Sequence, residues 1–297
     1  YDTTGNVSIT NTGGVTLEKS VSITRSGNLA ITANTNVTAN ASATITTHGS
    51  LDIDATTGSV TLVGVTTNGG NVTIDSNTTI TLQTTKVDTD GGSVTLTSGT
   101  DTAVNTAIDT SGGAAGTGAV SITAAGNITS AAAGDITTGG GNIIMLADSD
   151  GSGSGSIDIA GNLTSNGGDI FLGGGSNPFG TGVGNFTYNY ANYITNAASA
   201  GYATGSADEG VKLNNLVTID ATNTGGNSTG TITIRGKGHS SAASSYGVHL
   251  YGTNTIQTND GDINITGQGG AGTGGTANQY GIYSASIHTQ TITSTSG

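Results

Sequence analysis

Four pairs of aspartates, each two positions apart, are the residues of this chain with the clearest potential for chemistry. They are Asp52/Asp54, Asp88/Asp90, Asp148/Asp150 and Asp260/Asp262. Within a strand, residues i and i+2 point to the same face, so each pair would hold two carboxylates on one side. Glycosidases use two carboxyl groups about 5–9.5 Å apart, one of them with a raised pKa. A polysaccharide-active β-helix enzyme is therefore one hypothesis.

The placement of these aspartates favours solvated turns over an active site. Most of the pairs adjoin glycine, and they are scattered along the chain. One period of the repeat described below would bring Asp52 to Ile74 and Asp54 to Ser76, so stacking adds no carboxylate there. A lyase or hydrolase would need at least three carboxylates, or carboxylates with Arg235 or Lys237, in one groove. We expect the chain not to be an enzyme.

Metal and cofactor sites are few. The run from Asp148 to Gly151 resembles the opening of a calcium loop, but an EF-hand needs an acid at position 12, where this chain has Ile159. One adventitious calcium ion at Asp148 and Asp150 is the metal candidate, and no cofactor is expected. The histidines are isolated, without His-x-His or His-x-x-x-His spacing, so a zinc site is not predicted. They are His48, His239, His249 and His288.

A group of aromatic residues is the best candidate for ligand contact. A narrow β-helix core has no need of these side chains, whereas exposed tyrosines stack on sugar rings or anchor protein partners. The alternative is that they cover the side of the rod or cap a widened core. Tyr246/Tyr280 and Tyr251/Tyr283 are instead predicted to be stacked ladders. The candidate ligand-binding residues are Phe179, Phe186, Tyr188, Tyr190, Tyr193 and Tyr202.

All these side chains must be positioned by a repeat. Its signature is Gly, a small polar residue, then apolar–polar–apolar, as in Gly5-Asn6-Val7-Ser8-Ile9 and Gly70-Asn71-Val72-Thr73-Ile74. The alternation predicts strands with one buried face, and the glycine before each strand is expected to supply a positive φ at the corner. No apolar stripe of helical spacing persists. The period is nearly constant over the first five copies, which begin at Gly5, Gly27, Gly49, Gly70 and Gly92.

A short strand pair cannot bury its apolar face alone, so successive periods must stack. The sequence therefore predicts an all-β fold, a parallel β-helix (β-solenoid) of about a dozen coils. We expect a regular β-helix over 1–172, in which one coil is one period of about 22 residues. An irregular Gly/Tyr-rich insertion follows at 173–210, and longer coils of about 31–34 residues resume over 211–297. The segments 239–245 and 270–279 are predicted to be loops that leave one side of the rod.

Composition excludes several classes of protein. The chain has 6 Lys+Arg against 19 Asp+Glu, a net charge of −13, which argues against nucleic acid and anionic membrane surfaces. No run of about 18 apolar residues is present, so no membrane span is predicted. There is no cysteine, and no signal peptide is visible at the start. Both ends read as if cut from a longer repetitive protein, and open coil ends predict end-to-end self-association.

The Gly-Asn-Val-Thr-Ile and Gly-Asp-Ile-Asn-Ile copies at residues 70–74 and 261–265 resemble the repeat regions of filamentous haemagglutinin-type bacterial adhesins. The resemblance covers nearly the whole chain. It implies a rod-shaped β-helix, a secreted or cell-surface location on a bacterium, and attachment to other cells, a host surface or glycans. The amino-terminal secretion domain of that family is not evident in this sequence.

The sequence thus predicts a structural and adhesive segment of a large exported surface or fibre protein. An ice-binding β-solenoid is a second alternative beside the enzyme, because outward Thr-x-Thr triplets can order water. Thr79-Ile80-Thr81 and Thr231-Ile232-Thr233 are examples. The triplets do not recur at a constant offset on one face, which counts against this alternative.

Overall fold

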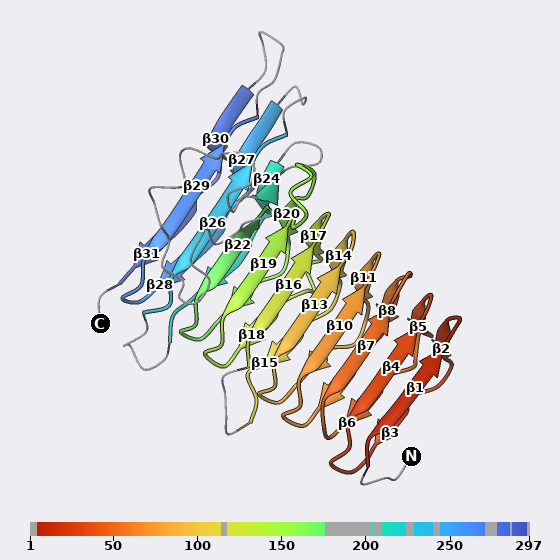
Figure 1. Ribbon diagram of the computed structural model, residues 1–297. Helices are drawn as coiled ribbons and strands as arrows, with labels where there is room; N and C mark the ends of the chain where they lie inside the picture. Colours follow the sequence, from red (N-terminus) through yellow and green to blue (C-terminus); the bar gives the residue numbers. More distant parts are fainter. Residues whose placement is uncertain are drawn as a thin grey trace.

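The fold is a rod built from three parallel β-sheets, here named A, B and C (Figure 1). A computed structural model describes residues 5–113, 118–175, 203–204, 209–223, 229–239, 244–270, 278–285 and 287–295. In these residues the chain visits sheets A, B and C in turn and then returns to sheet A one rung further along. Each circuit is one coil, and the predicted all-β parallel β-helix is confirmed.

Sheet A receives the first strand of each coil. Along the sheet, β1 to β22 follow the order of the coils, β26 pairs with β22, β23 and β29, and all pairs are parallel. Its strands are β1 (Val7–Asn11), β4 (Leu29–Ala33), β7 (Leu51–Ala55), β10 (Val72–Ser76), β13 (Val94–Ser98), β16 (Val120–Ala124), β19 (Ile143–Ala147), β22 (Ile170–Gly174), β23 (Ala203–Thr204), β26 (Ile232–Lys237) and β29 (Ile263–Gln268).

Sheet B receives the second strand of each coil, and this strand is longer in the last three coils than in the first seven. Its strands are β2 (Val15–Leu17), β5 (Val37–Ala39), β8 (Val60–Leu62), β11 (Ile80–Leu82), β14 (Thr102–Val104), β17 (Ile128–Ser130), β20 (Ile157–Ile159), β24 (Glu209–Leu213), β27 (Ser244–Leu250) and β30 (Asn278–Ser284).

Sheet C closes each coil. Its strands are β3 (Val21–Ile23), β6 (Ile45–Thr47), β9 (Val65–Thr67), β12 (Val87–Asp88), β15 (Ile108–Thr110), β18 (Ile136–Thr138), β21 (Leu163–Thr164), β25 (Thr218–Asp220), β28 (Asn254–Thr258) and β31 (Gln290–Ser294).

The described residues form ten coils rather than about a dozen. The period lengthens after the regular part, and the described strands between Gly168 and Gly230, β22 to β25, belong to a single coil. At about 4.8 Å per rung, ten coils give a rod roughly 45 Å long. The rod is continuous across the long coil, because Ile170 is in register with Ile232 and Leu163 with Ile219.

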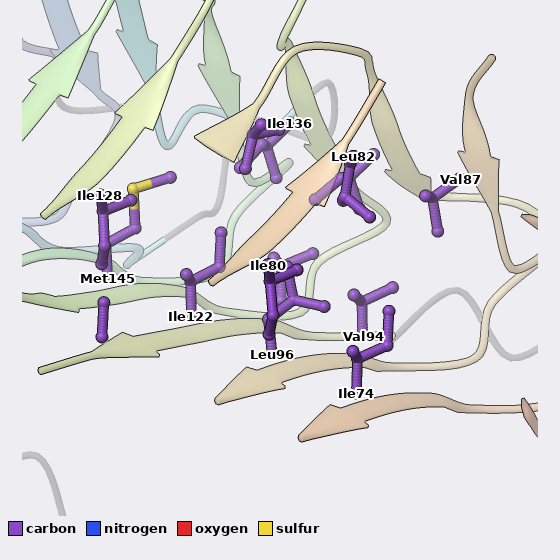
Figure 2. Close-up of a cluster of buried hydrophobic side chains, with 14 of the residues drawn as sticks. Ile74, Ile80, Leu82, Val87, Val94, Leu96, Ile122, Ile128, Ile136 and Met145 are labelled. Carbon is purple, nitrogen blue, oxygen red and sulfur yellow. The ribbon is translucent and has the colours of Figure 1, made fainter. Parts of the chain in front are cut away.

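The core is a column of aliphatic side chains inside the three sheets. In the fourth coil Val72 and Ile74 come from sheet A, Ile80 and Leu82 from sheet B, and Val87 from sheet C, and none is more than 1% exposed. Figure 2 shows that the side chains of successive coils lie above one another, with Ile74 near Leu96 and Ile80 between the sheets. Burial of these alternating positions is the main driving force for the fold.

The glycine of the repeat signature has a different role from the one predicted. Positive φ is found one residue earlier, at Gly69 (φ 81°) and Gly91 (φ 97°), and not at Gly70 or Gly92. A Cβ atom on Gly70 would clash with the carbonyl of Gly49, and one on Gly92 with the carbonyl of Gly70. Stacked corners approach so closely that only glycine fits.

The small polar residue after that glycine forms a ladder between coils. The Asn71 Oδ1 atom accepts a hydrogen bond from the backbone N–H of Ser93 at 2.9 Å, and Asn28 Oδ1 accepts from Ser50 N–H at 2.8 Å. The Oδ1 atom of Asp169 likewise accepts from the backbone N–H of Thr231 at 2.7 Å, across the long coil. Each side chain therefore satisfies a backbone donor of the next corner that the sheet ladder leaves free.

Buried hydroxyls close the corner between sheet C and the next strand of sheet A. The Thr67 hydroxyl donates to the carbonyl of Gly70 at 2.6 Å, and Ser165 donates to Gly168 at 2.5 Å. Both hydroxyl residues are at most 2% exposed. Because each hydroxyl has a backbone partner, its burial inside the core leaves no hydrogen bond unmade.

Candidate functional site

The outer face of sheet B changes character along the rod. One outward position per coil is in register from β2 to β30, and threonine occupies it in five of the first six coils. The last three coils replace threonine by larger polar and aromatic side chains. In order, the residues are Thr16, Thr38, Thr61, Thr81, Ala103, Thr129, Asp158, Lys212, His249 and Tyr283.

Six ring-bearing side chains meet on the last coils, and we name them the aromatic patch. The Tyr246 and Tyr283 rings stack with their centroids 4.4 Å apart and an interplanar angle of 12°. Tyr280 is parallel to both, at 6.1 Å from Tyr246 and 5.5 Å from Tyr283. The three described tyrosines on the strands of sheet B therefore form one parallel set. The patch comprises Tyr246, His249, Tyr251, Tyr280, Tyr283 and His288.

Histidines connect the parallel tyrosines to Tyr251. The His249 ring lies edge-on to Tyr246 at 4.9 Å and to Tyr251 at 5.7 Å. His288 lies 6.0 Å from Tyr251 on the other side. Tyr251 is 49% exposed and Tyr280 is 45% exposed, whereas His249 is only 8% exposed. The patch therefore has a packed centre and two accessible rings.

Glycines place this patch by letting sheets A and B touch. A Cβ on Gly247 would lie 2.6 Å from the carbonyl oxygen of Gly236, and one on Gly281 would lie 2.5 Å from that of Gly267. Gly247 thus faces sheet A, and the next residue, Val248, is also buried in the core. Because two consecutive residues face inward, Tyr246 and His249 both lie outside although they are three apart.

Charged groups border the patch on the preceding coil. Glu209 is in register with Tyr246, and Lys212 is in register with His249. The Glu209 Oε1 atom lies 2.9 Å from His249 Nδ1, and the Lys212 Nζ atom lies 5.6 Å from the centroid of the Tyr251 ring. The hydrogen bond from His249 lowers the pKa of Glu209 from its ordinary value, against the opposing effect of burial. Glu209 is therefore held as a carboxylate beside the rings.

The ladder predictions are half right. Tyr246 and Tyr280 are in register and stacked, as predicted. The Tyr251/Tyr283 pairing is wrong, because Tyr283 is in register with His249. Tyr246, Val248 and His249 all pair with residues 34 positions later, whereas Tyr251 and Tyr283 are 32 positions apart. The recurrence of Tyr246-Gly247-Val248 as Tyr280-Gly281-Ile282 is the signal in the sequence for this site.

The residues predicted for ligand contact lie outside the described residues, and the insertion proposal remains a prediction. These residues are Phe179, Phe186, Tyr188, Tyr190, Tyr193 and Tyr202. Of the loops predicted on one side, the segments after β26 and β29 both connect sheet A to sheet B. Their far ends differ from the prediction, because residues 244–245 and 278–279 already belong to β27 and β30.

The calcium candidate is a loop-organising carboxylate. Asp148 is fully buried, and its Oδ1 atom accepts from the N–H groups of Gly153 at 2.9 Å and Ser154 at 3.2 Å, and from the Ser152 hydroxyl. Asp150 instead accepts the N–H of Ser152 at 3.0 Å. These donors occupy Oδ1, whereas Oδ2 of Asp148 is buried and has no hydrogen-bond partner among the described residues. Among the described residues, no group of three or more His, Asp or Glu could hold a metal ion.

One detail of the prediction for the acidic pairs is wrong. Asp54 is in register with Asp75 on the next coil, so a third carboxylate does join Asp52 and Asp54 on sheet A. All three are exposed. The three carboxylates lie on the outer face of sheet A, in contact with solvent.

The other acidic residues act in turns and a surface ion pair. Asp88 and Asp109 are in register on sheet C, and Lys86 Nζ lies 2.8 Å and 3.2 Å from their carboxylates. The hydrogen bond that Lys86 donates to Asp88 is the main cause that raises the pKa of Lys86. Asp90 has φ 50° at a corner, so it does not share a strand face with Asp88. Asp260 and Asp262 are at a corner, on either side of Gly261.

The two basic residues named for an enzyme groove both belong to sheet A. Arg235 and Lys237 lie on β26, and Arg235 is only 8% exposed.

Among the described residues, no helix is present that could cross a membrane. In comparisons with protein-family models, with curated proteins and with solved structures, nothing matches this chain. Proposals about its function therefore rest on the geometry of the chain itself.

Proposed function

We propose that this chain is a structural and adhesive segment of an exported bacterial surface or fibre protein. In this proposal the regular coils are a spacer, and the later coils carry the surface that makes contact with another cell, a host surface or glycans. The observation that carries the proposal is the contrast between the small polar outer face of the first coils and the aromatic patch on the last ones.

The spacer role is supported by three continuous ladders. Every described coil is joined to the next through sheets A, B and C, so separating two coils would break backbone hydrogen bonds in all three sheets together. Side-chain ladders such as Asn71 to Ser93 add a second set of links at the corners. A rod of this kind holds a distal surface at a fixed distance from its base.

Self-association through the coil ends is a second element of the proposal, and the partner is another copy of this chain. Ile292 in β31 is 47% exposed, although its in-register neighbour Ile256 is 1% exposed. Covering such an edge with another coil would bury the isoleucine and satisfy unpaired strand groups. Sedimentation velocity should therefore detect species larger than the monomer, and Ile292→Asp should reduce them.

The attachment role is tested by displaying the full chain on a bacterial cell that does not otherwise adhere. Such cells should be retained on an epithelial monolayer at least several-fold better than cells without the chain. Gly70→Val, which disrupts the stacked corners, should abolish retention. Equal retention with and without the displayed chain would overturn the proposal.

Ice binding remains an alternative because one observation favours it more than the sequence did. Thr16, Thr38, Thr61 and Thr81 are in register on sheet B, although this row holds one threonine per coil and not the predicted Thr-x-Thr triplets. The row of threonines is one residue wide and is interrupted by Ala103. A measurement of thermal hysteresis on the full chain decides this alternative, and a positive value would favour it over attachment.

A further inference from the structure

We propose that the aromatic patch is a binding site for neutral pyranose oligosaccharides. The inference rests on the proposed attachment function and specifies its ligand class. It concerns the described residues on β24, β27 and β30, and not the insertion that the sequence singled out.

The accessible rings provide the apolar half of such a site. Tyr251 and Tyr280 are about half exposed, whereas the threonines that precede them on this face are small. The C–H face of a pyranose ring is apolar and packs against the face of an aromatic ring, while its hydroxyls remain at the edge. Tyrosine suits this contact because it offers a rigid apolar body and a polar tip.

Packing within the patch fixes the rings before any ligand arrives. The rings of Tyr246, Tyr280 and Tyr283 differ in orientation by only 11–12°. The His249 ring is held in turn by its 2.9 Å contact with Glu209. Side chains that are ordered in the free protein lose little conformational entropy on binding. This matters for a sugar, because each stacking contact is weak.

Hydroxyl groups of a sugar also need polar partners, and the preceding coil supplies them. Glu209 uses one carboxylate oxygen on His249 and is 22% exposed at its side chain. The Lys212 ammonium group lies over one face of the Tyr251 ring, 5.6 Å from its centroid, so a sugar would stack on the other face. A carboxylate and an ammonium group next to stacking rings can accept from and donate to neighbouring hydroxyls of one sugar unit. The patch thus combines an apolar platform with both hydrogen-bonding functions.

Charge selects neutral sugars over acidic ones. The whole chain carries a net charge of −13, and Glu209 places a carboxylate at the patch itself. A sulfated or uronic-acid polysaccharide would be repelled over the Debye length at physiological salt.

Mutual stacking of the rings explains why Tyr246 and Tyr283 are less exposed. It does not account for the exposure of Tyr251, which directly follows β27 and lies outside the parallel set.

The test measures binding of the full chain to maltohexaose, cellohexaose and chitohexaose by isothermal titration, with heparin and polygalacturonate as acidic probes. At least one neutral hexasaccharide should bind, and neither acidic probe should. Tyr251→Ala and Tyr280→Ala should each weaken the binding about tenfold, while Tyr280→Phe should keep it within about threefold. Thr81→Ala, on the same face in a regular coil, is the matched control and should not change it.

Absence of neutral binding, binding that both alanine variants leave unchanged, or binding of the acidic probes alone would each overturn the inference. Thermal unfolding of every variant ensures that a loss of binding is not a loss of fold. If cells that display the chain adhere but the hexasaccharides do not bind, the attachment proposal stands without this site. If the sugars bind but the cells do not adhere, the attachment proposal fails and the site stands.

Discussion

The first six coils and the last three share one kind of interior. They differ on the outer face of sheet B and in the corner between sheets A and B. In both regions sheet A contributes an apolar pair to the core, such as Val72 and Ile74 in β10 or Ile232 and Ile234 in β26. Outside the core, the first coils have short corners and small polar side chains. The last coils have long A-to-B connections and aromatic side chains. A solenoid can therefore change its surface while its core stays constant.

The difference has a physical reason in the corners. Each corner between sheets C and A must repeat every coil, because its glycine, its polar side chain and its buried hydroxyl all contact the coil before or after. The corner between A and B carries no such constraint in the last coils, where sheets A and B extend and meet through Gly236 and Gly247. Longer connections and larger side chains can therefore be accommodated at the corner between sheets A and B.

The contrast between the constrained C-to-A corner and the unconstrained A-to-B corner would fail if a side chain were tolerated at the C-to-A glycine. Gly70→Val places a side chain against the carbonyl of Gly49, where no flexible group can move away. We expect a loss of about 4 kcal/mol or more in the free energy of unfolding, or a failure to fold. Gly13→Ala is the matched control, because its nearest atom, Asn11 Oδ1, would be 3.7 Å from the new Cβ. Chemical denaturation followed by circular dichroism measures both, and equal stability of the two variants would contradict the corner argument.

The sequence was sufficient for the strands and the stacking, because both follow from local alternation and a nearly constant period. Val72 and Ile74 could be assigned to the core without any structure. The role of Gly70 could not, because a clash between coils is invisible in one coil's sequence. The register of Asp54 with Asp75 was missed for a related reason, since a period that is one residue shorter than its neighbours shifts every pairing by one.

The aromatic patch was only partly predictable. The repeat of Tyr-Gly-Val and Tyr-Gly-Ile revealed the Tyr246/Tyr280 ladder, and the structure confirms it. The partner of Tyr283 follows from the same 34-residue offset, which leads to His249 and not to Tyr251. The contact of Glu209 with His249 joins positions far apart in the sequence and left no local signal.

Truncation of an inward isoleucine tests how differently a central coil and the last described coil are packed. Ile74→Ala removes a fully buried side chain and should cost about 2–5 kcal/mol, since a cavity remains between well-packed coils. Ile292→Ala, at an inward position that is 47% exposed, should cost less than about 1 kcal/mol. Equilibrium unfolding in guanidinium measures the difference. Similar costs would show that the last coil is as tightly packed as the fourth.

The side-chain ladder at the corners offers a smaller test. Asn71→Ala leaves the Ser93 N–H without its acceptor and should cost about 1 kcal/mol, while Asn71→Asp should restore most of it. Asp169→Ala should cost somewhat more, about 1.5–3 kcal/mol, because the lost acceptor of Thr231 is charged. Thermal midpoints of the three variants rank these effects. A larger loss in the regular region would reverse the expected order.

Acidic pH should lower the stability of the last coils slightly more than that of the first coils, which is the smallest expected effect. The hydrogen bond from His249 is the main cause that lowers the pKa of Glu209, and Lys212 adds a Coulombic contribution. A carboxyl whose pKa is lower in the folded state stabilises the protein above its unfolded pKa near 4.5. That stabilisation is lost as the pH falls through the lower folded value. The last coils should therefore lose stability below about pH 4.5, whereas Gly70 and Asn71 at a regular corner carry no titrating group.

Glu209→Gln isolates this acid effect, because glutamine keeps the shape and an acceptor but cannot be protonated in this range. The thermal midpoint of the wild-type chain should fall more between about pH 5 and about pH 3 than that of the variant. Asp109→Asn is the matched comparison on sheet C. Burial raises the pKa of Asp109, but hydrogen bonds from Ser111 and Lys86 outweigh it and lower the net value. An unchanged pH dependence in Glu209→Gln would show that the carboxylate beside the rings does not stabilise the last coils.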